Sequence, residues 1–114
     1  MKILLKYKNH QISPLEIESV IRKHPEVLQV AVTGVPHPTD GELPVACVVL
    51  RKGSSATDQE IQNMVKDTLA DSKQLRGGVL FMAELPLTVS SKINRAKLKM
   101  IVLELINKEN NSNM

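Results

Sequence analysis

The feature that most constrains this chain is a pair of apolar segments of strand length that follow one another. The run "VACVVL" (45–50) is continuously apolar, which is typical of a strand buried on both faces. The preceding "VLQVAVTGVP" (27–36) predicts a second strand, with Leu28, Val30 and Val32 on one side. The intervening "HPTDGELP" is rich in turn-forming residues. These segments predict two strands of a sheet, and the second of them needs cover on both faces.

Three segments have the start signals and the apolar spacing of helices. The predicted cap residues are Ser13 with Glu16, Thr57 with Glu60, and Asn94. Pro14 suits a first helical position, and Pro25 is expected to end the first helix near His24. The apolar positions at helical spacing are Ile17, Val20 and Ile21; Ile61, Met64, Val65 and Leu69; and Leu98, Ile101, Val102, Leu105 and Ile106.

Length and composition fit a single domain. The chain has 114 residues, of which 42% are hydrophobic, and this is enough for a core. The opening "ILLKYKNHQI" has an extended pattern with Tyr7 and Ile12 as packing positions, and "VLFM" (79–82) is a short strand. The expected order is strand, helix, strand, strand, helix, strand, helix, which is typical of a small α+β domain with helices packed on a mostly antiparallel sheet. The domain is expected to span residues 1–108, with a disordered tail at 109–114.

The charge and the aromatic content disfavour nucleic acid as a partner. The formal net charge is +3 and the isoelectric point is about 9.1, which favours anionic partners in general. One Tyr, one Phe and no Trp leave few rings on which bases could stack. The alternative of a stand-alone basic binding module depends on a cluster near the C-terminus: Lys92, Arg95, Lys97 and Lys99.

Cysteine usage and apolar run length predict an intracellular protein. The single Cys47 excludes an internal disulfide and favours a reducing compartment. The run "ILL" (3–5) is too short for a secretory signal, and no segment has the length of a membrane span. A cytoplasmic or peroxisomal location is expected, although the C-terminal "NKENNSNM" carries no peroxisomal address.

Lysines near both ends of the chain are candidate functional residues. Lys92, in "PLTVSSKINRAKL", precedes a predicted helix, where a cation opposes the helix dipole by roughly 0.3–1 kcal/mol. A bound anion would reverse that sign. Lys6 and Lys8 alternate with apolar residues and would share one face of a strand. Gln11 would join them only if the chain bends near Asn9. Solvated surface charge is the alternative at Lys92, and a hydrated sheet edge is the alternative for the other two lysines.

Other reactive side chains have simpler structural explanations. His37 and Asp40 lie in a loop without a nucleophile, so a loop-structuring role is favoured over catalysis. Cys47 precedes two valines and is expected in the core. "LRGGV" lacks the lysine–threonine pair of a phosphate loop and predicts a turn with positive φ. The three histidines are widely spaced and lack cysteine companions, so no metal site is predicted.

Three stretches taken together resemble one family. "LKYKNHQISPLEIESVIRKHPEV", "VAVTGVPHPTDGELPVACVVL" and "QLRGGVLFMAELPLTVSSKINRAKL" are similar to the C-terminal subdomain of AMP-forming adenylating enzymes. The likeness is to the branch of acyl-CoA synthetases, 4-coumarate–CoA ligases and beetle luciferases, and it covers about residues 2–106. It implies a large N-terminal domain that binds ATP and a carboxylic acid, and a small C-terminal domain that acts as a mobile lid. Acyl-AMP and pyrophosphate would form first, and CoA would displace AMP after the lid rotates.

The resemblance implies roles for individual residues. Lys92 matches the lysine of the adenylation step, which stabilises charge near the carboxylate and the α-phosphate. Lys6 and Gln11 match residues close to the acyl-adenylate in the thioester-forming pose. The remaining matches are two CoA-contacting positions and the hinge: Lys8, Asn9 and Lys2.

The resemblance also implies substrates and partners. The parent would be an acid–thiol ligase for a fatty or aryl acid that uses ATP, Mg²⁺ and CoA. This chain, as a monomeric domain without its ATP-binding partner, is expected to be inactive and to bind none of them tightly. The hinge match at Lys2 favours an excised piece, and a luciferase parent is an alternative. Ser91 and Asn9 replace glycines that are usual in the family, which puts the adenylation loop and the pantetheine path in question.

Overall fold

The computed structural model describes residues 4–112, with side chains described as far as Lys108. The hinge expected at Lys2 lies outside the described residues. The elements in chain order are β1 (Leu5–Tyr7), β2 (His10–Ile12), α1 (Pro14–Ile21), β3 (Val27–His37), β4 (Gly41–Leu50), α2 (Asp58–Thr68), the short 3₁₀ helix η1 (Asp71–Lys73), β5 (Gly78–Phe81) and α3 (Arg95–Ser112).

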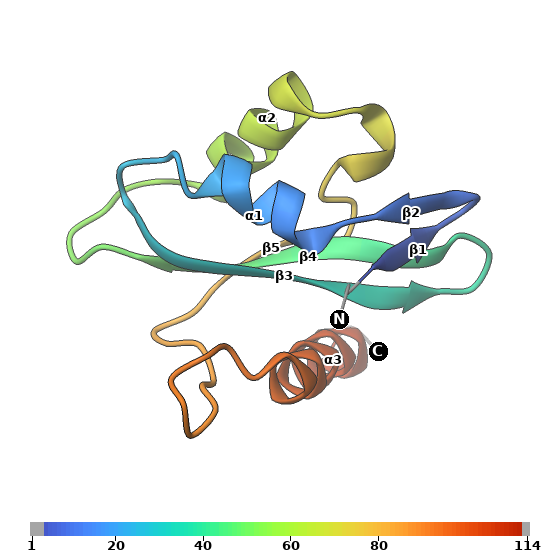
Figure 1. The fold of residues 1–114 in the computed structure, drawn as a ribbon. Helices are drawn as coiled ribbons and strands as arrows, with labels where there is room; N and C mark the ends of the chain where they lie inside the picture. Colours follow the sequence, from blue (N-terminus) through green and yellow to red (C-terminus); the bar gives the residue numbers. More distant parts are fainter. Residues whose placement is uncertain (1–3, 113–114) are drawn as a thin grey trace.

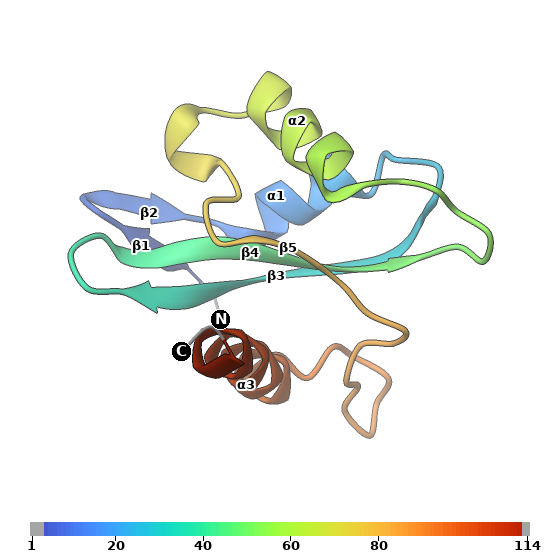
Figure 2. The ribbon, with the colours of Figure 1, turned by 180° about the vertical axis from the view of Figure 1, so that it is seen from behind.

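The elements form one sheet with the strand order β2-β1-β4-β3, and β5 also pairs with β4. Every pairing is antiparallel except that of β4 with β5, which is parallel. Figures 1 and 2 show α1 and α2 on one face of this sheet and α3 on the other. The predicted α+β class with a mostly antiparallel sheet is therefore confirmed.

Strand β4 belongs to both cores, as its continuous apolar sequence predicts. Ala46 and Val48 join the core formed with α1 and α2, whereas Val45, Cys47 and Val49 join the core formed with α3. Alternate side chains of a strand point to opposite faces, so a strand between two helical layers must be apolar throughout.

Strand β3 departs from the predicted alternation at its start. A bulge between Val27 and Gln29 shifts the register, and Leu28 is 54% exposed. Val30 and Val32 are buried as predicted. The grouping of Leu28 with the two valines was therefore wrong, because the extra residue of a bulge reverses the alternation of faces.

The opening segment forms a hairpin of two short strands, where the sequence predicted one extended segment. Tyr7 pairs with His10 across the turn, and Tyr7 and Ile12 are both buried as predicted. Tyr7 also pairs with Gly41 of β4, which attaches the hairpin to the sheet. Gly41 has φ +90°, and a Cβ there would collide with the backbone carbonyl of Lys6, so only glycine fits this junction.

The cap predictions have mixed outcomes. The Thr57 hydroxyl accepts from the Glu60 amide at 3.3 Å, and Asn94 Oδ1 accepts from the Lys97 amide at 3.1 Å. Ser13 occupies the N-cap position of α1 without a side-chain cap bond. Glu16, its predicted capping-box partner, instead contacts Lys73 Nζ at 2.6 Å. Tertiary pairing has replaced the local bond.

One predicted helix end is wrong, and a second helix extends into the segment expected to be a tail. Helix α1 ends at Ile21, with Arg22 as C-cap, before the His24–Pro25 position that the proline suggested. Helix α3 continues to Ser112, so residues 109–112 are helical where a disordered tail was expected. Gly78 has φ +99°, which agrees with the predicted turn at "LRGGV".

Candidate functional site

The β1–β2 hairpin brings Lys6 and Gln11 together. These residues are directly opposite in the strand register, so their side chains project from the same face. The turn at Lys8 and Asn9 supplies the bend that this juxtaposition requires. Both side chains are exposed, whereas their neighbours Leu5, Tyr7 and Ile12 are buried. The buried face fixes the hairpin and leaves the polar face open to a ligand.

The hairpin turn holds its left-handed residue at Lys8, where φ is +53°. Asn9, which stands where the family usually has glycine, does not have a positive φ. The Lys8 amide donates to the Asp40 carbonyl at 2.7 Å, which ties the turn to the β3–β4 connection. A lysine in this conformation is strained by about 1–2 kcal/mol relative to the right-handed region.

An open pocket of about 340 Å³ lies beside the hairpin. Two cationic side chains lie over the Tyr7 ring, with Lys8 Nζ at 5.4 Å and Arg76 Cζ at 5.0 Å from its centroid. Asp71 pairs with Arg76 at 2.8 Å and lines the same pocket. The pocket can therefore accept an anionic group beside an aromatic ring, with Lys8 as its least neutralised cation.

Lys92 lies in the segment between β5 and α3, here called the Lys92 loop (residues 82–94). The loop closes on itself: the Thr88 amide donates to the Lys92 carbonyl at 2.6 Å, and the Lys92 amide donates to Thr88 Oγ1 at 3.2 Å. Leu85 is buried and Ile93 is partly buried in the core beside α3, so the base of the loop is anchored while Val89 near its tip is fully exposed.

Ser91 carries the strained backbone that a glycine would relieve. Its φ is +66°, in the left-handed region, next to the exposed Lys92 side chain. Among the described side chains, no carboxylate lies within ion-pair distance of Lys92. The ammonium is therefore available to an external anion near the start of α3.

The hairpin and the Lys92 loop lie at opposite ends of the sheet (Figures 1 and 2), and neither view brings them together. Lys6 alternates with buried Leu5 and Tyr7, so it points away from the face that carries α1 and α2. The hairpin that carries Lys6 and the loop that carries Lys92 are therefore separated along the sheet (Figures 1 and 2).

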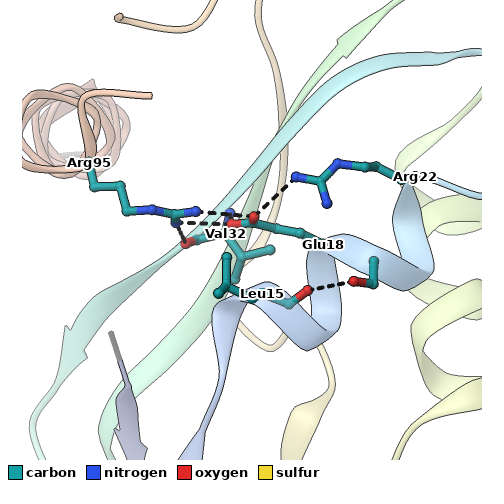
Figure 3. Close-up of polar contacts among 6 residues, drawn as sticks. Leu15, Glu18, Arg22, Val32 and Arg95 are labelled. Atoms are coloured by element: carbon teal, nitrogen blue, oxygen red, sulfur yellow. Dashed lines mark hydrogen bonds and ion pairs between the residues drawn. The ribbon is translucent and has the colours of Figure 1, made fainter. Parts of the chain in front are cut away.

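A buried carboxylate is the prominent polar feature that the sequence analysis missed. Glu18, on α1, is fully buried and accepts from the Val32 amide at 2.8 Å. Arg95, the first residue of α3, donates two hydrogen bonds to this carboxylate, from Nη1 to Oε2 at 3.0 Å and from Nη2 to Oε1 at 3.1 Å (Figure 3). Arg22 Nη2 adds a contact at 3.4 Å. The available signal was an acid among the apolar positions Ile17, Val20 and Ile21, where an unpaired charge is rarely tolerated.

The basic cluster proposed near the C-terminus is partly neutralised. Arg95 pairs with Glu18, and Lys99 Nζ pairs with Glu42 Oε2 at 3.1 Å. These two cations hold α3 against the rest of the domain. The pattern weakens the alternative of a stand-alone basic surface, since only Lys92 and Lys97 of the cluster have no ion pair among the described side chains.

Two histidines have structural roles. His37 Nδ1 accepts from the amides of Thr39 and Asp40 at 3.3 and 3.1 Å, which shapes the β3–β4 turn as predicted. His24 lies within 4.8 Å of Glu26 and Glu60. Its Nδ1 accepts from the Glu26 amide at 3.1 Å, which is a local bond, and Nε2 lies 3.2 Å from Glu60 Oε2. Both ring nitrogens are therefore engaged, and the Nε2 contact ties the segment after α1 to α2.

Cys47 is a core residue, as predicted. Its side chain is fully buried, and burial raises the pKa of the Cys47 thiol to about 12. Because the thiol ionises less readily in the folded chain than in the unfolded chain, its protonated form favours folding. This contribution to the free energy of unfolding is present below about pH 9 and is lost as the pH rises toward 12.

Alkylation of Cys47 at pH 8 is expected to be at least about 10³-fold slower in the folded chain than in denaturant, because each pKa unit lowers the thiolate fraction about tenfold. The measurement is the rate of iodoacetamide incorporation by mass spectrometry. Similar rates in both conditions would show that the thiol is accessible.

Residues 16–92 match the model of the protein family described as "AMP-binding enzyme C-terminal domain". The chain is 41% identical over 102 residues to a luciferin 4-monooxygenase of Nipponoluciola cruciata, covering 90% of this chain and 19% of that protein. It is 43% identical over 100 residues to 4-coumarate–CoA ligase-like 9 of Oryza sativa subsp. japonica, covering 87% and 18%.

Solved structures give the same result. Apo MatB from Rhodopseudomonas palustris aligns with a TM-score of 0.84 at 30% identity, covering 90% of this chain and 20% of that chain. An acyl-CoA synthetase from Brucella canis aligns with a TM-score of 0.81 at 35% identity, covering 90% and 19%. The chain spans about a fifth of the length of these relatives.

No helix in the described part of the chain combines the length and apolar character needed to cross a bilayer. Because residues 16–92 are well over half of its length, the chain belongs to the AMP-binding enzyme C-terminal domain family.

Proposed function

We propose that this chain is the mobile C-terminal domain of an AMP-forming acid–thiol ligase, an acyl-CoA synthetase for a fatty or aryl acid. In the first half-reaction, a carboxylate oxygen attacks the α-phosphorus of ATP and pyrophosphate leaves. In the second, the CoA sulfur attacks the acyl carbon and AMP leaves. The chain supplies Lys92 to the first step and, after rotation, the β1–β2 hairpin to the second.

The observation that carries this proposal is the separation of two cationic sites on one sheet. The hairpin and the Lys92 loop lie at opposite ends (Figure 1). This separation supports the proposal that a single rotation of the domain exchanges one for the other over a fixed nucleotide. A hinge needs only a few changed dihedrals for such a rotation. Lys2 is the proposed hinge position.

In the adenylation pose, Lys92 stabilises charge. The Lys92 ammonium is exposed and has no carboxylate partner among the described side chains. It is therefore suited to contact the carboxylate of the acid and the α-phosphate of ATP. The capped start of α3 lies close by in sequence and adds amide dipoles of the favourable sign.

In the thioester pose, the hairpin faces the acyl-adenylate and CoA. Lys6 and Gln11 project from one face and are proposed to contact the adenylate. Lys8 and Asn9 occupy the turn, beside the open pocket that Tyr7 and Arg76 line, and are proposed to contact CoA. A cation beside an aromatic ring suits the phosphate and adenine groups of such a ligand.

The proposed partners are a large ATP-binding domain, ATP with Mg²⁺, CoA and a carboxylic acid. The solved relatives include an ATP-bound MatB, and a curated relative is named as a CoA ligase-like protein. Among the described residues, the candidate cation cluster of His24, Glu26 and Glu60 does not fit Mg²⁺, because it depends on an imidazole that is engaged on both nitrogens. The metal is therefore assigned to the partner domain.

The isolated chain is expected to release no pyrophosphate from ATP and a panel of carboxylic acids, because the nucleotide pocket lies in the large domain. A coupled pyrophosphate assay measures this, with a full-length acyl-CoA synthetase as positive control. Turnover by the isolated chain would contradict the assignment of the pocket.

Lys6→Ala in the full-length ligase is expected to slow thioester formation from supplied acyl-AMP by about tenfold or more, because a charged contact to the adenylate is worth roughly 1.5–3 kcal/mol. Acyl-AMP formation is expected to change little. Each half-reaction is measured by single-turnover chromatography. Lys52, an exposed lysine in the turn just after β4, provides the control variant Lys52→Ala. Equal slowing of both half-reactions by Lys6→Ala would remove the proposed division of labour.

A luciferase parent is the second candidate. The 41% identity to a luciferin 4-monooxygenase favours it, and the same adenylation step would serve light emission. Light output from the full-length protein with ATP and luciferin discriminates between the two parents.

A further inference from the structure

We propose that Arg95 and Glu18 form a positioning latch that sets the orientation of the Lys92 loop for adenylation. This inference rests on the proposed function, since it assigns a role to residues that do not touch the substrate. The latch is the bidentate pair between the first residue of α3 and the buried carboxylate of α1 (Figure 3). Its consequence is that the adenylation lysine is oriented by a contact on the other helical layer.

The Lys92 loop has few other attachments. Its tip is closed by bonds between Thr88 and Lys92, which are internal to the loop and do not orient it. The bond from the Asn94 amide to the Pro86 carbonyl is likewise internal. The start of the loop is tied to β4 by the bond from the Met82 amide to the Val48 carbonyl at 2.9 Å, and its base is held by the apolar contacts of Leu85 and Ile93. Apolar contacts fix depth but are not directional. At the end of the loop that carries Lys92, Arg95 supplies the directional constraint, three residues after the lysine.

The latch is anchored at a strand edge. Strand β3 pairs only with β4 among the described strands, so Val32 presents an unpaired amide and carbonyl. Glu18 Oε2 accepts from that amide at 2.8 Å, and Arg95 Nη1 lies 3.4 Å from the carbonyl oxygen. The guanidinium is therefore held by a carboxylate and by the main chain of a strand that is paired with β4 along its length.

Helix stability does not explain an arginine at this position. A cation at a helix N-terminus opposes the dipole, and the last turn is the favourable place for one. Arg95 is 25% exposed on its side chain and Glu18 is fully buried, so the pair is largely removed from water. A costly placement that ends in a two-bond contact is typical of a geometric role.

The test compares half-reactions of the full-length ligase carrying Arg95→Met. We expect the kcat for acyl-AMP formation to fall by about 10- to 100-fold with an unchanged KM for ATP, since a displacement of about 1 Å at a reacting group has an effect of this size. Thioester formation from supplied acyl-AMP is expected to be unchanged. Arg95→Lys keeps the charge but loses the fork, so partial recovery is expected.

Two ion pairs of the same domain provide controls. Lys99→Met removes the 3.1 Å pair with Glu42 from the same helix, one turn further along. Arg22→Met removes the 3.4 Å contact with the same Glu18 carboxylate without touching α3. Both variants are expected to leave the two half-reactions near wild-type rates. All variants are measured at a temperature where circular dichroism shows them folded, and Arg95→Lys replaces Arg95→Met if the latter does not fold.

The outcomes separate this inference from the proposed function. If Lys92→Ala selectively slows adenylation but Arg95→Met and Arg95→Lys do not, the latch is wrong and the proposed function stands. If the Arg95 variants slow both half-reactions equally, the pair acts only on stability or on protection of the β3 edge. If Lys92→Ala has no selective effect, the proposed function itself fails.

Discussion

Lys92→Ala in the full-length ligase is expected to slow acyl-AMP formation by about 10²–10³-fold, the size of effect seen when one preorganised charge-stabilising donor is removed from an active site. The ammonium is exposed, has no carboxylate partner among the described side chains, and is carried on a loop anchored at its base. Its loss leaves the charge that develops between carboxylate and α-phosphate without this compensation. Single-turnover release of pyrophosphate measures the effect.

The second half-reaction provides the internal control for Lys92. Thioester formation from supplied acyl-AMP is expected to be within about threefold of wild type, because the loop lies at the far end of the sheet from the hairpin (Figure 2). Lys97→Ala is the matched control, since Lys97 is an exposed lysine of the same cluster on α3. Equal losses in both half-reactions, or an equal effect of Lys97→Ala, would contradict the assignment.

Glu18→Ala is expected to lower the free energy of unfolding of this chain by about 3–5 kcal/mol, because it leaves a partly buried guanidinium and a buried amide without their partner. Arg95 and the Val32 amide both lose their bond to the carboxylate. Domains of this size are stable by about 5–15 kcal/mol, so the loss is a large part of the total. Chemical denaturation followed by circular dichroism measures it.

Two variants separate the contributions to this loss. Glu18→Gln keeps an acceptor for the Val32 amide and is expected to be less destabilising than alanine. Arg22→Met removes only the outer contact, whose arginine side chain is 55% exposed, and is expected to change stability by less than about 1 kcal/mol. A Glu18→Ala variant as stable as Arg22→Met would mean that the buried network contributes little net stability.

The predicted elements were reliable where a local pattern specified them. The apolar run of β4 and the helical spacing of Ile61 and Val65 predicted strands, helices and buried positions that the structure confirms. Predictions that depended on a single local bond were less reliable. The Ser13–Glu16 capping box did not form, because Glu16 contacts Lys73 instead.

The candidate site was partly accessible from sequence. The lysines themselves were identified from their positions and from the family resemblance. Whether Gln11 lies beside Lys6 was open, because in a single straight strand the two side chains would point to opposite faces, and only a turn between them brings them together. The hairpin register settled this geometric question, because directly opposite residues share a face. Their catalytic roles remain predictions.

What the sequence by itself determined is the type and order of most strands and helices and most of the buried positions, since both depend on periodicity within a few neighbouring residues. Only the tertiary structure decided that Glu18 and Arg95, 77 positions apart, meet across the edge of β3, and that the two lysine sites lie at opposite ends of the sheet. The physical reason is that a contact between distant segments depends on how helices and strands are placed in space, and no local pattern of residue types encodes that placement.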